Sequence, residues 1–371
     1  MSKKVKSTLG EITLSIFDGK HGDCKDHPHS GCYFISVKDL QEYGIDYSQA
    51  REIDPVDFQQ NYTRTNLENG DTLYANTGDT IGKSLYIKNN PFAKRTSFQK
   101  SVAVLKPNTE HVEPRYLYYL LKYETPRLRK AATGSGQKNL LLSTMRNFEV
   151  SIHDRFTQRK IVETLSCIDD RIQCNYEVND NLQQMAHMTF MHCFWGKPTN
   201  GTIGEILIEH EKSPIQVGQA KNTVGSYPFF TSGDTVLRWK SSLIDGRNIF
   251  MNTGGNAGVK FYVGKAAYST DTWCVSARDG LSDYLYLFLD SIKPELSQKF
   301  FQGTGLKHLQ KPILKNRPMY IPSKDELEVF NHSVIPWLTL VSDNIRESER
   351  LAALRDWLLP MLMNGQATIE D

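Results

Sequence analysis

The stretch GSGQKNL at residues 134–140 returns as GTGLKHL at residues 303–309. Three further motifs return in the same order: TLGEI at 8–12 becomes TIGEI at 202–206, NTG at 76–78 becomes NTG at 252–254, and YLY at 116–118 becomes YLY at 284–286. A helical pattern closes each copy. Four matches in unbroken order indicate that a whole domain has been duplicated.

Each copy reads as a mixed domain with many short strands. Apolar and β-branched runs between turn residues predict strands at 73–76, 84–87, 101–105 and 148–152, and in the second copy at 250–252, 260–263 and 319–321. Helices are expected at 115–123, with Pro114 at a favourable first position, and at 283–289. The predicted fold class is α/β (α+β), with two similar domains related by pseudo-twofold symmetry.

The segment after each domain carries the spacing of a paired helix. Apolar or small residues follow one another at alternating steps of four and three, which is a heptad seam. The predicted seam comprises Ile161, Leu165, Ile168, Ile172 and Leu182 in the first helix, and Val341, Ile345, Leu351, Leu354 and Leu358 in the second. Such helices pack on a partner, and these two are long enough to form an antiparallel pair.

The two predicted helices contain polar seam positions, and glycine and proline residues indicate where they end. Asn175 and Asn179 fall on the first seam, where they would either fix the register at some cost in stability or mark a drift of the seam. A helix over 155–193 would be on the order of 55–60 Å long. Gly196 and Pro198 are expected to stop the first helix, and Pro360 to kink or end the second.

The sequence therefore divides into four parts. The first domain spans residues 1–152, the first spacer helix 153–196, the second domain 197–322 and the second spacer helix 323–371. An antiparallel helical pair would place the two domains at opposite ends of a spacer.

Charge follows the same division. Residues 1–152 hold 21 lysines and arginines against 17 acids, and residues 197–322 hold 15 against 10. Residues 153–195 hold 4 against 6, and residues 323–371 hold 4 against 9. A basic excess confined to two globular domains suits contact with a polyanion, although ordinary surface variation gives the same pattern.

Composition narrows the class of protein. The chain of 371 residues has no run near the roughly 20 apolar residues of a membrane span. Its basic start lacks an apolar segment behind it, which argues against a signal peptide. Six cysteines scattered over a long chain read as reduced thiols, and a cytoplasmic location is expected.

The whole chain resembles the specificity subunit of type I restriction–modification systems. The resemblance rests on the domain–helix–domain–helix order, the Gly-x-Gly-x-Lys-x-Leu loop before each helix, the segment 161–172 and the ending LRDWLLPMLMNG at 354–365. The usual Pro-Pro and Glu-Gln before each helix are kept only in part, as Gln158 in the first copy and as Pro322 with Glu326 in the second.

The resemblance implies a function and a set of partners. Each domain would be a target recognition domain that reads one part of a split sequence in double-stranded DNA, and the helical pair, a coiled coil, would fix the spacing. Two methyltransferase (modification) subunits would dock on the helices, and restriction subunits would join outside them. S-adenosylmethionine, Mg²⁺ and ATP would belong to these partners, with no cofactor in this chain.

The sequence offers little catalytic chemistry of its own. Phe301-x-Gly303-x-Gly305 looks like a loop that binds S-adenosylmethionine, but that loop needs a preceding strand and a following helix. No Pro-Pro-Tyr or Pro-Pro-Trp motif of amino methylation occurs. Histidines and cysteines cluster between His21 and Cys32, yet their spacing matches no usual zinc module, so no metal site is predicted. An exposed polar loop, one that could reach DNA, is the alternative.

Candidate DNA contacts cluster around the repeated motifs. Asparagine can read adenine, and lysine can read guanine or neutralise phosphate. The candidates are Asn76, Lys83, Arg127, Arg129, Lys130, Lys138 and Asn139 in the first copy, and Asn252, Asn256, Lys260, Lys307 and His308 in the second. Turn formation by asparagine beside glycine is the structural alternative.

The sequence thus favours a non-catalytic DNA-recognition subunit. One rival is a stand-alone DNA methyltransferase or nuclease with duplicated recognition domains, which would need a cofactor fold and a catalytic motif. Another is a scaffold whose helices recruit partners without DNA.

Overall fold

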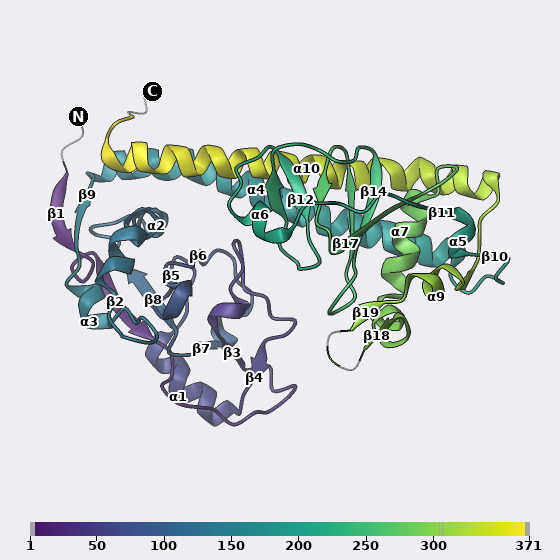
Figure 1. The fold of residues 1–371 in the computed structure, drawn as a ribbon. Coiled ribbons are helices and arrows are strands. Elements are labelled where there is room, and N and C mark those ends of the chain that lie inside the picture. Colours follow the sequence, from purple (N-terminus) through teal and green to yellow (C-terminus); the bar gives the residue numbers. More distant parts are fainter. Residues whose placement is uncertain (1–3, 304, 306, 368–371) are drawn as a thin grey trace. The chain divides into compact units, whose positions relative to one another are not determined.

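The computed structural model describes residues 4–303, 305 and 307–367 (Figure 1). These residues form two compact units. Unit 1 comprises the described residues up to Gln173 together with those from Arg350 onward, and unit 2 comprises Cys174–Glu349. Helices α4 (Arg155–Phe194) and α10 (Lys324–Asn364) each contribute to both units.

The core of unit 1 is an antiparallel four-stranded sheet covered by one helix. Its strands are β2 (Thr13–Asp18), β8 (Val102–Pro107), β5 (Thr72–Ala75) and β6 (Ser84–Tyr86), in the order β2-β8-β5-β6. Helix α2 (Pro114–Ala131) lays fully buried Tyr116 and Tyr119 into the same core. The predicted helix ended at Tyr123, which was too early, because buried Leu128 continues the apolar face.

Shorter elements complete unit 1. They are the sheet β4-β3-β7 (Arg51–Glu52, Tyr33–Ile35, Thr96–Phe98), the pair β1 and β9 (Val5–Thr8, Glu149–Ile152), helices α1 (Pro55–Thr65) and α3 (Leu142–Arg146), and the 3-10 turns η1 (Val37–Asp39), η2 (Gly78–Thr80) and η3 (Ala93–Arg95). Asp54 caps α1 by accepting a hydrogen bond from the Val56 amide.

Unit 2 repeats this plan strand by strand. Its four-stranded sheet has the order β11-β17-β14-β15 (Leu207–Glu209, Thr272–Ala277, Arg247–Asn252, Val259–Val263), beside a sheet β13-β12-β16 (Leu237–Trp239, Tyr227–Phe230, Ala267–Tyr268) and the pair β10 and β20 (Gly201–Thr202, Pro318–Met319). The parallel pairing of β3 with β7 returns as β12 with β16. The duplication predicted from four motifs is therefore confirmed.

The helices of unit 2 follow the same order, with additions. They are α5 (Ile203–Ile206), α6 (Val217–Lys221), α7 (Ser282–Ser291), α8 (Lys293–Glu295), the π-helical turn η4 (Leu296–Phe300) and α9 (Lys311–Lys315), with the short pair β18 and β19 (Phe301–Gln302, His308–Leu309). Helix α7 corresponds to α2, and it buries Tyr284 where α2 buries Tyr116.

Helices α4 and α10 pack on each other over the predicted seam. In unit 1, Ile161 and Leu165 of α4 share a core with Leu359 and Leu362 of α10. In unit 2, Ala186 and Phe190 of α4 share a core with Val334 and Leu338 of α10. The start of α4 thus meets the end of α10 and the reverse, so the pair is antiparallel.

Two features of α10 differ from expectation. Pro360 does not end the helix, which continues to Asn364 because Leu362 and Met363 pack into the core of unit 1 and hold the last turn. Leu354 is 43% exposed, whereas neighbouring Arg355 is buried. The seam therefore passes through Arg355 and Leu359, each one position after the predicted Leu354 and Leu358.

Candidate nucleic-acid interface

Inside each unit, the turn that carries the repeated Asn-Thr-Gly motif hydrogen-bonds to the loop that carries the repeated Gly-x-Gly-x-Lys-x-Leu motif. In unit 1, the Gly78 amide donates to the Lys138 carbonyl at 2.7 Å, and the Leu140 amide donates to the Asn76 carbonyl at 2.8 Å. In unit 2, the Gly255 amide donates to the Lys307 carbonyl at 2.9 Å, and the Leu309 amide donates to the Thr253 carbonyl at 3.0 Å. The motifs that revealed the duplication are thus structural partners.

A cleft of about 590 Å³ opens beside this pairing in unit 1. It lies where the end of β2, helix α1, the turn after β5, the loop before β8 and the start of α3 meet. The lining residues are Asp18, His21, Arg64, Asn76, Thr77, Lys100, Gln137, Asn139, Leu140, Leu141, Leu142 and Ser143. We call it the first cleft.

The first cleft carries a surplus of positive charge. Asp18 at its base has a side chain only 8% exposed, and it accepts hydrogen bonds from Arg64 Nη2 at 2.6 Å and His21 Nε2 at 2.9 Å. Lys100 is exposed at the rim. The charges of Arg64 and Lys100 therefore face the single carboxylate of Asp18, and this positive balance suits contact with a phosphate backbone.

A second cleft, of about 240 Å³, occupies the corresponding place in unit 2. The end of β11, the turn after β14, the loop before β17 and the start of α9 form it. Its lining residues are Glu209, His210, Glu211, Lys212, Thr253, Thr270, Asp271, Thr272, Trp273, Cys274 and Lys311. The duplicated scaffold thus presents two clefts with different side chains.

The second cleft has the opposite charge balance. Glu209 accepts hydrogen bonds from Lys311 Nζ at 2.7 Å, Lys315 Nζ at 2.6 Å and Trp273 Nε1 at 2.7 Å. Burial raises the pKa of Glu209, but these lysines outweigh burial and lower it to about 2, so the group stays ionised. Lys311 is therefore already neutralised within the protein. Three carboxylates line this cleft against two lysines.

The predicted asparagines have different surroundings in the two units. Asn76 is buried and lines the first cleft. Asn252 is also buried, but its Nδ2 donates to the Asn256 carbonyl at 3.0 Å. A Cβ on Gly258 would lie 2.5 Å from that Nδ2, so glycine is needed to admit the amide. The turn-forming alternative describes Asn252, whereas Asn256 itself is exposed.

Lys83 and Lys260 hold corresponding loops in place. Lys83 Nζ donates to the carbonyl of Val37, just after β3, at 3.1 Å. Lys260 Nζ donates to the carbonyl of Thr231, just after β12, at 2.8 Å, and also to that of Gly233. Burial lowers the pKa of Lys260. Both lysines therefore have a structural role that the motif pattern did not indicate.

The remaining candidates differ in whether their side chains are bound within the protein. Arg127 pairs with Glu124 at 2.6 Å near β9, and Arg129 Nε donates to the Ile81 carbonyl at 2.6 Å. Both arginines are exposed, as are Lys130, Lys138, Asn139, Lys307 and His308. The structure brings Asn76 and Asn139 together in the first cleft, and it does not bring Arg127 there.

Four residues that line the first cleft were not among the candidates predicted from the sequence: His21, Arg64, Lys100 and Gln137. They come from separate parts of the chain and only the sheet order joins them. One signal was available, since the polar segment at His21 was noted as able to reach DNA.

That segment was also weighed as a metal site. Its side chains contact other groups: His21 pairs with Asp18 at 2.9 Å, His27 Nδ1 lies 3.8 Å from Asp54, and Asn61 donates to Cys24 Sγ at 3.4 Å. Over residues 4–303, 305 and 307–367, no three His, Cys, Asp or Glu side chains converge as a metal ion would need.

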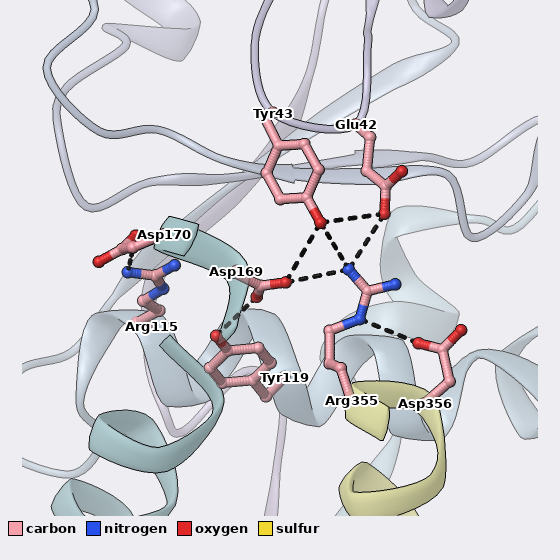
Figure 2. Close-up of polar contacts among 8 residues, drawn as sticks. All are labelled: Glu42, Tyr43, Arg115, Tyr119, Asp169, Asp170, Arg355 and Asp356. Atoms are coloured by element: carbon pink, nitrogen blue, oxygen red, sulfur yellow. Dashed lines mark hydrogen bonds and ion pairs between the residues drawn. The ribbon is translucent and has the colours of Figure 1, made fainter. Parts of the chain in front are cut away.

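A buried polar network joins the helical pair to the domain in unit 1 (Figure 2). Arg355 of α10 donates to Asp169 of α4 at 2.9 Å, with side chains 5% and 2% exposed. Tyr119 of α2 donates to the other oxygen of Asp169 at 2.7 Å, and Arg355 reaches Tyr43 at 2.8 Å. Burial would lower the pKa of Arg355, but Asp169 and Tyr43 hold it above its ordinary value.

Within unit 2 the helical seam is polar where Asn175 and Asn179 lie. Asn175 donates to Ser348 at 3.2 Å, and Asn344 donates to Asn179 at 2.9 Å. All four side chains are buried, so the asparagines lie on the seam. The other predicted seam residues are buried, except that Leu182, Ile345, Leu351 and Leu358 are half-buried and Leu354 is exposed.

No helix in the described part of the chain has the length and apolar character needed to cross a membrane.

Comparison with known proteins gives one consistent family. The sequence model of the "Type I restriction modification DNA specificity domain" matches twice, over residues 29–184 and 195–333. The HindI specificity subunit of Haemophilus influenzae is 28% identical over 52% of this chain, which spans 41% of that subunit. The MjaIX specificity subunit of Methanocaldococcus jannaschii is 22% identical over 91% of this chain and 87% of its own length.

The fold has a counterpart among solved structures. The S subunit of a type I restriction–modification system from M. genitalium superposes with a TM-score of 0.61 over 97% of this chain and 96% of that one. The identity is 14%, so this likeness concerns the fold alone.

Proposed function

Because the chain belongs to the type I restriction–modification specificity family, we propose that it is the DNA-reading, non-catalytic subunit of such a complex. Each target recognition domain reads one half of a split site in double-stranded DNA, and the two halves differ. The observation that carries this proposal is the pair of clefts at the same place in the duplicated fold, lined by different side chains.

The helical pair serves as spacer and as docking surface. Two methyltransferase subunits bind to it and bring S-adenosylmethionine, and restriction subunits join them with ATP and Mg²⁺. Leu354 and Trp357 support this role, since they are 43% and 58% exposed on α10 although apolar. A complex that acts on chromosomal DNA works in the cytoplasm.

A DNA-binding assay tests the proposal. The full chain, with and without its modification subunits, is offered duplex DNA with a randomised central segment over a range of salt concentrations. We expect enrichment of a two-part motif and a steep fall of affinity with salt. The scaffold alternative predicts partner binding with no enriched sequence.

The enzyme alternative is tested on the same preparation. The chain alone is incubated with DNA and either labelled S-adenosylmethionine or Mg²⁺. We expect neither methyl transfer nor cleavage until modification or restriction subunits are added. Activity of the chain alone would contradict the non-catalytic role.

A matched shortening of both helices tests the spacer role. Deleting residues 173–179 of α4 and 344–350 of α10 removes one heptad from each helix and takes out both polar pairs of the seam, Asn175 with Ser348 and Asn179 with Asn344. About 10 Å of helix is lost, which corresponds to roughly 3 bp of DNA. We expect the same two half-sites with a shorter spacer between them. An unaltered spacer in an assembled complex would contradict this role.

A further inference from the structure

The loop that carries residues 137–139 is fixed on both sides in unit 1. Besides its bonds to the turn after β5, it pairs with Thr133: the Asn139 amide donates to the Thr133 carbonyl at 2.7 Å, and the Thr133 amide donates back at 3.0 Å. Asn139 also forms bridges with Thr77 and Thr133. Its backbone is therefore held like a short strand between two neighbours.

The side chains of the loop differ in whether they line the first cleft. Gln137 and Asn139 line the first cleft, whereas Lys138 between them does not. The candidate lysine thus stays outside the cleft lining, and two amides remain in it.

Both amides are exposed and are little used within the protein. Asn139 Oδ1 accepts from Thr77 Oγ1 at 3.5 Å, the limit of a hydrogen bond. A Cβ added to Gly78 would lie 3.2 Å from Gln137 Nε2, so the glycine leaves room for that side chain. Asn252 in unit 2 differs, because its amide is already bound to the Asn256 carbonyl.

An amide side chain offers one acceptor and two donors, the pattern that pairs bidentately with the N6 and N7 edge of adenine. Lys100, exposed at the rim of the same cleft, supplies a charge for a backbone phosphate. We infer that Gln137 and Asn139 are base-reading residues of the first domain, that each fits an adenine, and that Lys100 holds the adjoining phosphate. This inference rests on the proposed function.

The test is selection of duplex DNA from a randomised pool by the full chain assembled with its modification subunits. In Gln137→Ala and in Asn139→Ala, we expect preference for the correct base to fall by about 5- to 150-fold at one or two positions of one half-site. The other half-site and the spacer stay unchanged. Asn139→Arg should move the preference at its position toward guanine.

Two controls separate base reading from general effects. Lys138→Ala alters the same loop outside the cleft lining and should leave every base preference unchanged. Lys100→Ala should weaken binding equally for all sequences and lower the salt slope by about 1. Circular dichroism of each variant monitors folding, and Gln137→Ala leaves the contact between Asn139 and Thr77 intact.

The outcomes decide between the inference and the proposed function. If the unaltered complex selects a two-part motif and both alanine variants select it with undiminished preference, the inference is wrong and the proposed function stands. Loss of base preference in Lys138→Ala equal to that in Asn139→Ala would also overturn the inference. If the unaltered complex selects no motif, both fail.

Discussion

Each unit uses one arginine–aspartate pair to attach the helical pair to its domain. In unit 1 both residues of the pair lie on the helices, and in unit 2 both lie on the domain. In unit 1 the arginine lies on the helix, since Arg355 of α10 pairs with Asp169 and reaches the domain at Tyr43. In unit 2 the arginine lies on the domain: Arg247 of β14 pairs with Asp283 of α7 and donates to the Thr339 hydroxyl of α10 at 2.8 Å.

The positions that match the charged network of unit 1 are apolar in unit 2. Asp169, Arg355 and Tyr119 correspond in the repeat to Leu338, Ala186 and Leu287, all of them in the core of unit 2. Helix packing at this point therefore needs no charge. A buried ion pair contributes little net stability, but its two residues tolerate only one arrangement. The Asp169–Arg355 pair of unit 1 therefore fixes the position of the two helices.

Removing one charge from unit 1 should have the largest effect. Asp169→Asn leaves the Arg355 charge buried without its main partner, and we expect a loss of about 3–5 kcal/mol in the free energy of unfolding of unit 1. Urea unfolding measures it. Asp356→Asn is the matched control, because Asp356 pairs with the same Arg355 but is 66% exposed, so its loss should be under about 1 kcal/mol.

Replacing the whole pair sharpens the comparison. Asp169→Leu combined with Arg355→Ala gives unit 1 the residues that unit 2 has, and it should restore most of the stability that Asp169→Asn loses. A double variant as unstable as the single one would show that the two units are not interchangeable here.

The next effect depends on pH. Burial, with the nearby charge of Lys4, lowers the pKa of His153 from 6.5 to about 4. The native unit then binds fewer protons than the unfolded chain, so stability present above pH 6.5 is lost as pH falls toward 4, by about 3 kcal/mol in all. The repeat has Pro322 at this position, which cannot titrate.

Hydrogen exchange in α2 and in α7 follows the two units separately between pH 7 and pH 5. We expect α2 to lose more protection than α7, and His153→Gln to remove most of that difference. Equal losses in both helices of the unaltered chain would contradict the assignment to His153.

The smallest effect concerns the loop lysines. Lys260→Met removes a partly buried donor from the carbonyls of Thr231 and Gly233 and should cost about 1–2 kcal/mol in unit 2. Lys83→Met removes a single bond from an exposed lysine in unit 1 and should cost less than about 1 kcal/mol. Thermal unfolding compares the two, and equal costs would contradict the difference in burial.

The order of the motifs and the spacing of apolar residues predicted the fold well, because the duplication shows each pattern twice. The strands and helices, the antiparallel pairing and the seam as far as Ile172 follow from motif order and from spacing. The seam near Arg355 does not, because a leucine periodicity gives no reason to bury an arginine. That choice depends on Asp169 and Tyr43, which lie far away in the sequence.

The candidate site was harder to predict, because it also depends on contacts between residues far apart in the sequence. Proximity to a motif says where a residue is in the chain and not which way its side chain points. Lys83 and Lys260 follow the predicted motif but turn to loop carbonyls. His21, Arg64 and Lys100 lie in three separate segments, and the sheet order β2-β8-β5-β6 brings their segments to one edge.

Lys4, the residue before β1, donates to the carbonyl of Met363 in α10, so two segments far apart in the sequence meet within unit 1. A circular permutant that links the residues near Lys4 to the end of α10 and opens the chain between Phe194 and Gly201 would begin with the second domain and interrupt none of the described helices and strands. If it folds, the order in which the two domains are translated does not decide the fold.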